Sequence, residues 1–106
     1  MTHPINGLDE VVHQRVRLGI LAVLAEARRA DFAFLRNSLE LSDGNLARHL
    51  QVLEAAGFVA IEKTFEGKRP RTWVRATPEG GRAFQAEVAS LEALLKRVTK
   101  QGRGSP

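Results

Sequence analysis

The chain has 106 residues, 43% of them apolar, and a formal net charge of +4, so we expect one domain with one modest core and no second domain. It contains no cysteine, so disulfide frameworks, thiolate metal sites and cysteine nucleophiles are excluded. No apolar run approaches a membrane span, and the N-terminus lacks the basic and apolar regions of a signal peptide. We therefore expect a soluble, cytoplasmic protein that does not contact a membrane.

The excess positive charge lies in one short segment. Residues 63–75 hold five basic side chains against Glu66 alone, whereas the rest of the chain holds eleven basic and eleven acidic side chains. A basic patch this concentrated favours a polyanionic partner. The alternative is a solvated hairpin whose charges only discourage pairing at a sheet edge.

Apolar spacing predicts the first two helices. Residues 1–7 show no period, so we expect a flexible N-terminal arm. Apolar residues then recur at intervals of three and four from Leu8 to Ala27, which predicts one long helix. After a short break, Asp31 can cap a second helix, and residues 30–32 are long enough to add a very short strand.

The segment from Leu41 to Gly57 is the most clearly bounded helix of the chain. Ser42 can accept a hydrogen bond from the backbone N–H of Asn45 at its start, and Gly57 can take the left-handed conformation that ends it. Three leucines share one stripe of this helix and the opposite face is polar. A link of three residues to the preceding helix forces a steep crossing, which predicts a helix-turn-helix. Taken alone, the polar face also fits an ordinary amphipathic surface helix.

Two β-rich runs follow, Phe58–Phe65 and Arg71–Ala76, around a basic turn at residues 66–70. They predict a two-stranded hairpin with a basic tip. Trp73 lies on the outer face of the second strand with Arg71 and Arg75, and we interpret it as a packing residue.

Thr77, Pro78 and Glu79 mark the start of the last helix as cap, first helical residue and first-turn acid. The apolar stripe of this helix is longer than the surface that so small a domain can bury. We therefore expect the far half of the helix to pack against the same helix of a second chain. One domain over residues 8–98 would then include this dimerisation helix, with a disordered tail over residues 99–106. The dimerisation residues are predicted to be Val88, Leu91, Leu94, Leu95 and Val98.

The order of these elements is that of a winged helix-turn-helix. This fold is α+β and mostly α, with a three-helix core, a two-stranded basic wing and a long C-terminal helix. The chain resembles small bacterial and archaeal winged-helix regulators related to the MarR and ArsR families over roughly Leu8 to Leu95. The runs that carry the resemblance are LSDGNLARHL at 41–50, LEAAGFV at 53–59, GKRPRTW at 67–73 and TPEG at 77–80.

The resemblance implies a homodimer that places its third helix, about residues 42–56, in the major groove of an inverted-repeat operator in double-stranded DNA. The wing, about residues 63–75, would lie on the backbone or minor groove. Arg48 has the fork that binds guanine and Asn45 could serve adenine, whereas His49 fits a hydrogen bond within the domain about as well as a DNA contact. The implied DNA-binding residues are Ser42, Asn45, Arg48 and His49 on the helix and Lys68, Arg69 and Arg71 on the wing.

The ArsR resemblance raises metal sensing, from which this chain departs. It has no cysteine, and its best local pair of ligands, Asp9 and His13, is more typical of a solvated helix face. MarR-like proteins often bind small aromatic ligands, but the sequence locates no pocket and leaves any effector unknown. We expect no metal and no cofactor.

The leading hypothesis is therefore a sequence-specific transcriptional regulator, a repressor because the chain has no obvious activation surface. A winged-helix module that binds protein and a nonspecific architectural DNA-binding protein are the alternatives. An enzyme is not expected, because the chain has no paired carboxylates, no Ser/His/Asp arrangement and no phosphate-binding glycine loop.

Overall fold

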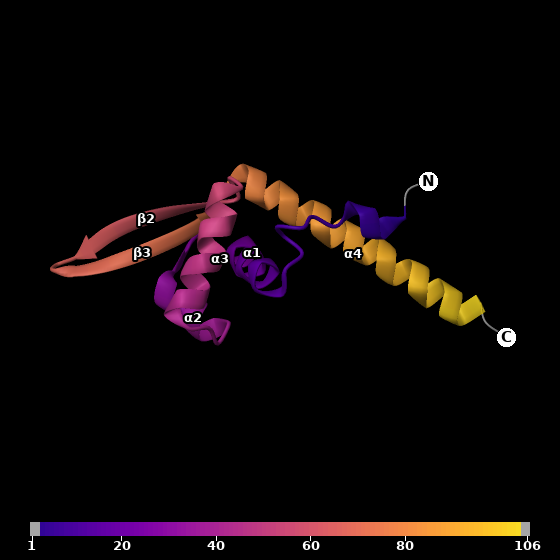
Figure 1. Ribbon diagram of the computed structural model, residues 1–106, viewed down its shortest axis with the longest axis horizontal. Helices are drawn as coiled ribbons and strands as arrows, with labels where there is room; N and C mark the ends of the chain where they lie inside the picture. Colours follow the sequence, from indigo (N-terminus) through magenta and orange to yellow (C-terminus); the bar gives the residue numbers. More distant parts are fainter. Residues whose placement is uncertain (1–2, 105–106) are drawn as a thin grey trace.

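The computed structural model describes residues 3–104, which form four α-helices, one 3-10 helix and a small antiparallel sheet (Figure 1). The wing hairpin and the far half of the last helix project in opposite directions from the helical core. No helix in this part of the chain is both long and apolar enough to cross a membrane. The elements are η1 Pro4–Gly7, α1 Arg15–Glu26, β1 Ala30–Asp31, α2 Phe32–Ser38, α3 Asp43–Ala55, β2 Val59–Glu66, β3 Arg69–Ala76 and α4 Pro78–Gly104.

The predicted winged helix-turn-helix is confirmed, with α2 and α3 joined by a tight turn. Asp31 caps α2 by accepting from Phe34 N, and Ser42 caps α3 by accepting from Asn45 N. Both helices end in a Schellman motif, in which the chain turns through a left-handed residue. That residue is Gly57 after α3, as predicted, but Glu40 after α2, with φ of 54°.

The core is one apolar cluster between α1, α2, α3 and the base of the sheet. The stripe of leucines predicted on α3 is buried and packs against α1 and α2. Because all three helices contribute to one cluster, the outward face of α3 is held by buried contacts on its opposite side. The buried apolar residues are Val12, Ile20, Leu21, Leu24, Ala30, Leu35, Leu46, Leu50, Leu53, Val59 and Val74.

The sheet has the order β1-β3-β2, all antiparallel. β2 and β3 pair along their whole length from Val59–Ala76 to Glu66–Arg69, whereas β1 covers only Val74 and Trp73 of β3. Beyond Trp73 the wing is therefore two strands alone, and such hairpins have little stability of their own.

The beginning of α4 lies close to the segment that joins α3 to β2. Thr77 caps the helix by accepting from Gly80 N, as predicted. A Cβ at Gly80 would lie 1.9 Å from the carbonyl oxygen of Phe58. Gly80 is thus required for packing.

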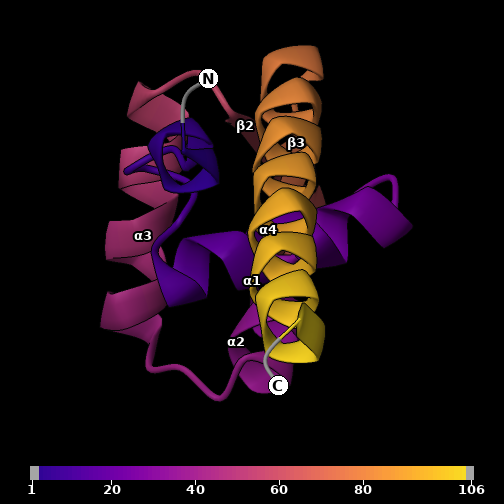
Figure 2. The ribbon, with the colours of Figure 1, turned by 90° about the vertical axis from the view of Figure 1, so that its right-hand side faces the viewer.

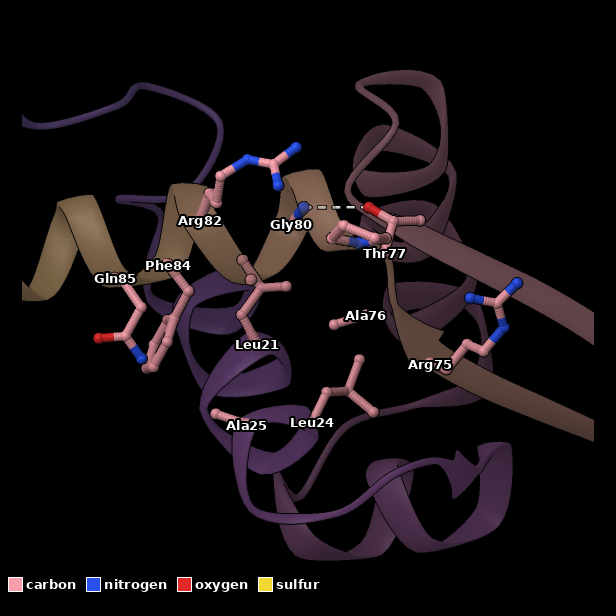
Figure 3. A pocket seen from close by; sticks show the side chains of 12 residues that line it. Leu21, Leu24, Ala25, Arg75, Ala76, Thr77, Gly80, Arg82, Phe84 and Gln85 are labelled. Atoms are coloured by element: carbon pink, nitrogen blue, oxygen red, sulfur yellow. Dashed lines mark hydrogen bonds between the residues drawn. The ribbon is translucent and has the colours of Figure 1, made fainter.

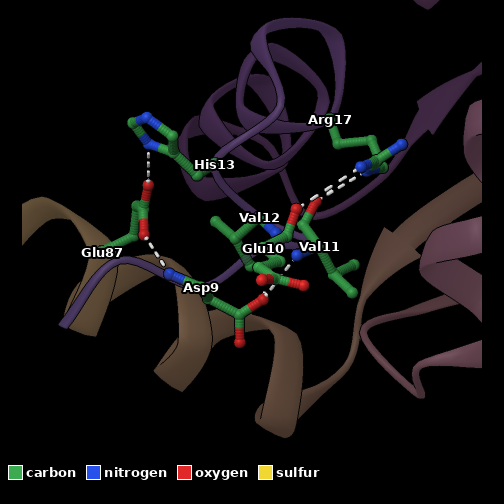
Figure 4. Close-up of polar contacts among 7 residues, drawn as sticks. All are labelled: Asp9, Glu10, Val11, Val12, His13, Arg17 and Glu87. Atoms are coloured by element: carbon green, nitrogen blue, oxygen red, sulfur yellow. Dashed lines mark hydrogen bonds and ion pairs between the residues drawn. The ribbon is translucent and has the colours of Figure 1, made fainter. Parts of the chain in front are cut away.

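The N-terminal segment differs from the expected long helix. α1 begins at Arg15, where Gln14 accepts from the backbone N–H of Val16 and Arg17, and not at Leu8. Residues 10–12 form a turn in which the Asp9 carboxylate accepts hydrogen bonds from the backbone N–H groups of Val11 and Val12 (Figure 4). The apolar spacing of the sequence suggested a helix here because Val12 is buried in the core, although it lies in a turn and not in a helix.

The two ends of the chain also contain more regular structure than expected. Pro4–Gly7, placed in a flexible arm, forms the 3-10 helix η1, which lies beside α4 (Figure 2). α4 continues to Gly104, so residues 99–104 of the expected disordered tail are helical. Residues 1, 2, 105 and 106, also assigned to the arm and the tail, lie outside the described part of the chain.

Candidate nucleic-acid interface

The outward face of α3 carries three of the four predicted helix contacts. Ser42, Asn45 and Arg48 are all exposed: Ser42 caps the N-terminus of the helix, Asn45 lies on its flank and Arg48 lies opposite the buried leucines. Gly44 lies among them with open space around it. A capped helix with small residues in its first turn and polar groups beyond has the shape and chemistry needed to enter a major groove.

Arg48 and Asn45 are bonded to each other. Arg48 Nη2 donates to Asn45 Oδ1 across 3.0 Å, one turn apart on the helix. This bond orients both side chains outward but leaves the remaining guanidinium donors and the Asn45 amide N–H groups available. Neither the pairing nor its geometry followed from the spacing alone.

His49 sits at the edge of this face and contacts α1. Arg17 Nη1 lies 3.2 Å from His49 Nδ1, and because a guanidinium only donates, Nδ1 must accept and the ring proton lies on Nε2. Burial, with the positive charges of Arg17 and Arg48, lowers the pKa of His49. The ring is thus neutral and held within the domain.

Arg17 of α1 contacts both the N-terminal turn and α3. Its Nε donates to the carbonyl of Val11 at 2.6 Å and its Nη2 to that of Glu10 at 3.5 Å (Figure 4). Since its third contact is His49, Arg17 joins the N-terminal turn to the recognition face. Contacts 32 residues apart leave no local pattern that could have predicted this role.

The basic side chains of the wing differ in their surroundings: those at the tip are exposed, whereas Arg71 is paired with carboxylates. Lys68 and Arg69 at the tip are exposed. Arg71, predicted as the third wing contact, is bonded to Asp31 and Glu66. These two carboxylates raise the pKa of Arg71, so its charge is permanent but locally compensated.

Trp73 packs between two guanidinium groups, in agreement with its assignment as a packing residue. Arg29 lies 3.8 Å and Arg71 4.3 Å from the ring centroid. Cation–π contacts of this kind stabilise the outer face of β3 where no helix covers it.

Asp9 and His13, the best local pair of possible metal ligands in the sequence, are both bonded to Glu87 of α4. His13 Nδ1 lies 2.6 Å from Glu87 Oε2, and Glu87 Oε1 accepts from Asp9 N at 2.9 Å (Figure 4). Glu87 is 1% exposed and ties the N-terminal turn to α4. Among residues 3–104, no three His, Cys, Asp or Glu side chains gather as metal ligands would.

An open groove of about 800 Å³ lies where α1, the end of β3 and the first turns of α4 meet. Leu21 and Leu24 of α1 form its floor opposite Phe84 of α4, while Arg82 lies at its edge (Figure 3). It is the kind of feature that sequence reasoning could not locate, because three separate elements form it.

Comparison with known proteins agrees with this architecture. A family model described as a winged helix DNA-binding domain matches residues 16–95. An uncharacterised protein of Methanocaldococcus jannaschii is 34% identical over 89 residues, which are 84% of this chain and 97% of that protein.

Two solved structures extend the comparison. A transcriptional regulator homologue from Pyrococcus horikoshii OT3 is 34% identical, with a TM-score of 0.80 over 85% of this chain and 89% of that one. ZitR of Lactococcus lactis, a zinc-responsive MarR family member, shares the fold at 17% identity, with a TM-score of 0.63 over 92% of this chain and 67% of that one. The chain therefore belongs to the winged helix DNA-binding domain family, whose structural neighbours are transcriptional regulators.

Proposed function

We propose that the protein is a cytoplasmic, homodimeric repressor that binds an inverted-repeat operator in double-stranded DNA. The observation that carries this proposal is the outward face of α3. It presents polar side chains on a helix fixed from behind by buried leucines, beside a wing whose tip is basic and exposed. We propose no catalytic activity and no bound metal or cofactor.

In this proposal α3 reads the sequence. Arg48 and Asn45 would exchange their mutual bond for contacts to guanine and adenine edges, each worth about 1–3 kcal/mol of discrimination. Ser42 at the helix N-terminus suits a backbone phosphate. His49 presents its Nε2–H at the edge of the same face, so it would act as a donor with a fixed tautomer.

The wing tip supplies affinity without sequence preference. Lys68 and Arg69 project at the turn between β2 and β3, where phosphates or a narrow minor groove would meet them. The resemblance also places Arg71 in this group, although its guanidinium already has two carboxylate partners.

The far half of α4 supports dimerisation. Leu95 is 66% and Val98 59% exposed, and Leu91 and Leu94 remain half-buried beside them. Val88 begins this stripe next to the N-terminal 3-10 helix, where Ile5 is also exposed. An apolar stripe at heptad-like spacing suits the same stripe of a second copy, which would bring two α3 helices onto successive half-sites.

Selection of binding sites from a random duplex pool at two salt concentrations tests the proposal. Enrichment of an inverted repeat with half-sites about 34–36 Å apart, or a multiple of that, is expected. Salt-sensitive retention without enrichment would point to a nonspecific architectural protein. No retention at either salt, from a sample shown to be dimeric, would favour the protein-interaction module.

Sedimentation of the free protein tests the dimer separately. Leu95→Glu is expected to convert a dimer to a monomer without unfolding it, because Leu95 is exposed in the monomer. Gln85→Glu, an exposed change on the first half of α4, is the matched control and should leave the dimer intact. A wild-type monomer at micromolar concentration would contradict the homodimer.

A further inference from the structure

One carboxylate joins the helix-turn-helix to the wing. Asp31 Oδ1 accepts from Phe34 N at 2.7 Å and so caps α2. Its Oδ2 accepts from Arg71 Nε at 3.1 Å and Nη2 at 2.8 Å. The two bonded residues are 40 positions apart in sequence; Asp31 is the last residue of β1 and the N-cap of α2, and Arg71 belongs to β3.

The guanidinium of Arg71 has two further partners besides Asp31. Its Nη1 donates to Glu66 on the neighbouring strand, and its face lies over Trp73. Two carboxylates therefore share one positive charge, and this cluster of three charged groups has a net charge of −1. The charge of Arg71 is therefore compensated locally, whereas Lys68 and Arg69 lie beyond it at the tip.

The register of the sheet explains why such a contact matters. The last bridge between β1 and β3 joins Asp31 to Trp73, and from Thr72 to the tip the wing has no third strand. Arg71 is two residues beyond that bridge. Its bond to Asp31 thus extends the attachment of the wing to α2 past the end of the sheet.

We propose that Arg71 is a positioning residue that fixes the angle of the wing to the helix-turn-helix through Asp31, so that α3 and the wing tip meet DNA as one rigid body. This inference rests on the proposed function. The backbone bond from Phe34 and the bond from Arg71 lower the pKa of Asp31, which keeps the carboxylate ionised for both partners.

Two matched substitutions separate positioning from simple charge. Asp31→Asn and Glu66→Gln each remove one negative charge beside Arg71, so electrostatic attraction alone would make both variants bind DNA more tightly. Asn also remains a good N-cap, so α2 is preserved. We expect Asp31→Asn to weaken operator binding by about three- to tenfold with an unchanged salt slope, and Glu66→Gln to bind as tightly as wild type or more so.

A double-mutant cycle then tests whether Arg71 acts through Asp31. Arg71→Lys keeps the charge but loses the fork, and under the proposal it should weaken binding as Asp31→Asn does. The double variant should bind no worse than the weaker single variant. Additive losses, a salt slope lowered by about one in Arg71→Ala, or tighter binding by Asp31→Asn would show a direct phosphate contact and overturn the proposal.

Hydrogen exchange of the free protein provides a readout that does not depend on DNA. Amides of residues 63–72 should exchange faster in Asp31→Asn and Arg71→Lys, and not in Arg69→Ala. Trp73, the only tryptophan of the chain, should become more accessible to a fluorescence quencher in the same two variants. If wild type binds no DNA while these changes occur, the proposed function fails and the attachment stands; unchanged exchange and quenching would refute the attachment itself.

Discussion

The recognition helix and the wing each present an arginine on the side proposed to face DNA, but in different electrostatic settings. Arg48 on α3 is exposed and bonded only to the neutral amide of Asn45. Arg71 on β3 is half-buried between two carboxylates and the Trp73 ring. The residue type is the same, yet one guanidinium has donors to offer and the other is already compensated. The role of an arginine here is decided by its partners.

Removal of the support behind α3 should have the largest effect. Leu46 is 0% exposed, so Leu46→Ala is expected to lower the free energy of unfolding by about 3 kcal/mol through lost burial and the cavity left behind. Urea denaturation measures this. Val52→Ala, on the exposed side of the same helix, should change the free energy of unfolding by less than about 0.5 kcal/mol; equal losses from both would mean that α3 is not held from behind.

Arg48→Ala should change which sequences are bound. Loss of one base contact is expected to cost about 1–3 kcal/mol on the preferred operator and to relax the preference at one position of each half-site. Competition between the operator and single-base variants measures the effect. A loss of the same size on every sequence would assign Arg48 to the DNA backbone.

Arg69→Ala should weaken binding to all sequences alike. Because the exposed wing tip is proposed to meet phosphates, the slope of log affinity against log salt should fall by about one. Titrations of operator and random duplex at several salt concentrations measure both quantities. A loss confined to the operator would contradict the division of roles between α3 and the wing.

Acid should weaken the attachment of the wing through Asp31. The folded pKa of Asp31 is lowered below its ordinary value of 3.8. The stability that the carboxylate adds is therefore complete above the unfolded pKa and is lost as pH falls through the folded pKa. Between pH 5 and pH 2, wild type should lose more free energy of unfolding than Asp31→Asn; parallel pH profiles would mean that the carboxylate adds nothing.

The smallest expected effect concerns the turn that leads into α3. Glu40 adopts a φ of 54° there, whereas the equivalent position after α3 and the wing turn use Gly57 and Gly67. Glu40→Gly should therefore stabilise the fold by about 0.5–1 kcal/mol, measured by thermal denaturation. Glu40→Ala keeps the strain and should give no such gain.

Local signals predicted the fold well. The caps Asp31, Ser42 and Thr77 and the helix end at Gly57 act within four residues of themselves, so sequence alone was enough to place α2, α3 and the start of α4. The predicted start of α1 was wrong. The turn before the helix also places an apolar residue, Val12, in the core, so its apolar spacing resembles that of a helix.

The candidate site was less accessible from sequence, because its decisive contacts are distant along the chain. The exposed positions on α3 followed from periodicity. The bonds of Arg71 to Asp31 and of His49 to Arg17 span 40 and 32 residues, and they change what each side chain can offer to DNA. Roles assigned by matching positions to a motif cannot include such partners.

The close packing of Gly80 against the Phe58 carbonyl marks a point about which α4 could pivot. From that point the helix runs to Gly104, a span of about 36 Å at 1.5 Å per residue. A tilt of about 5° at Gly80 would move the far end of α4 by about 3 Å, roughly the rise of two helical residues. Phe58 lies three residues beyond the end of α3, so a small angular change of α4 beside the recognition helix would become, at the far end of α4, a displacement large enough to alter packing there.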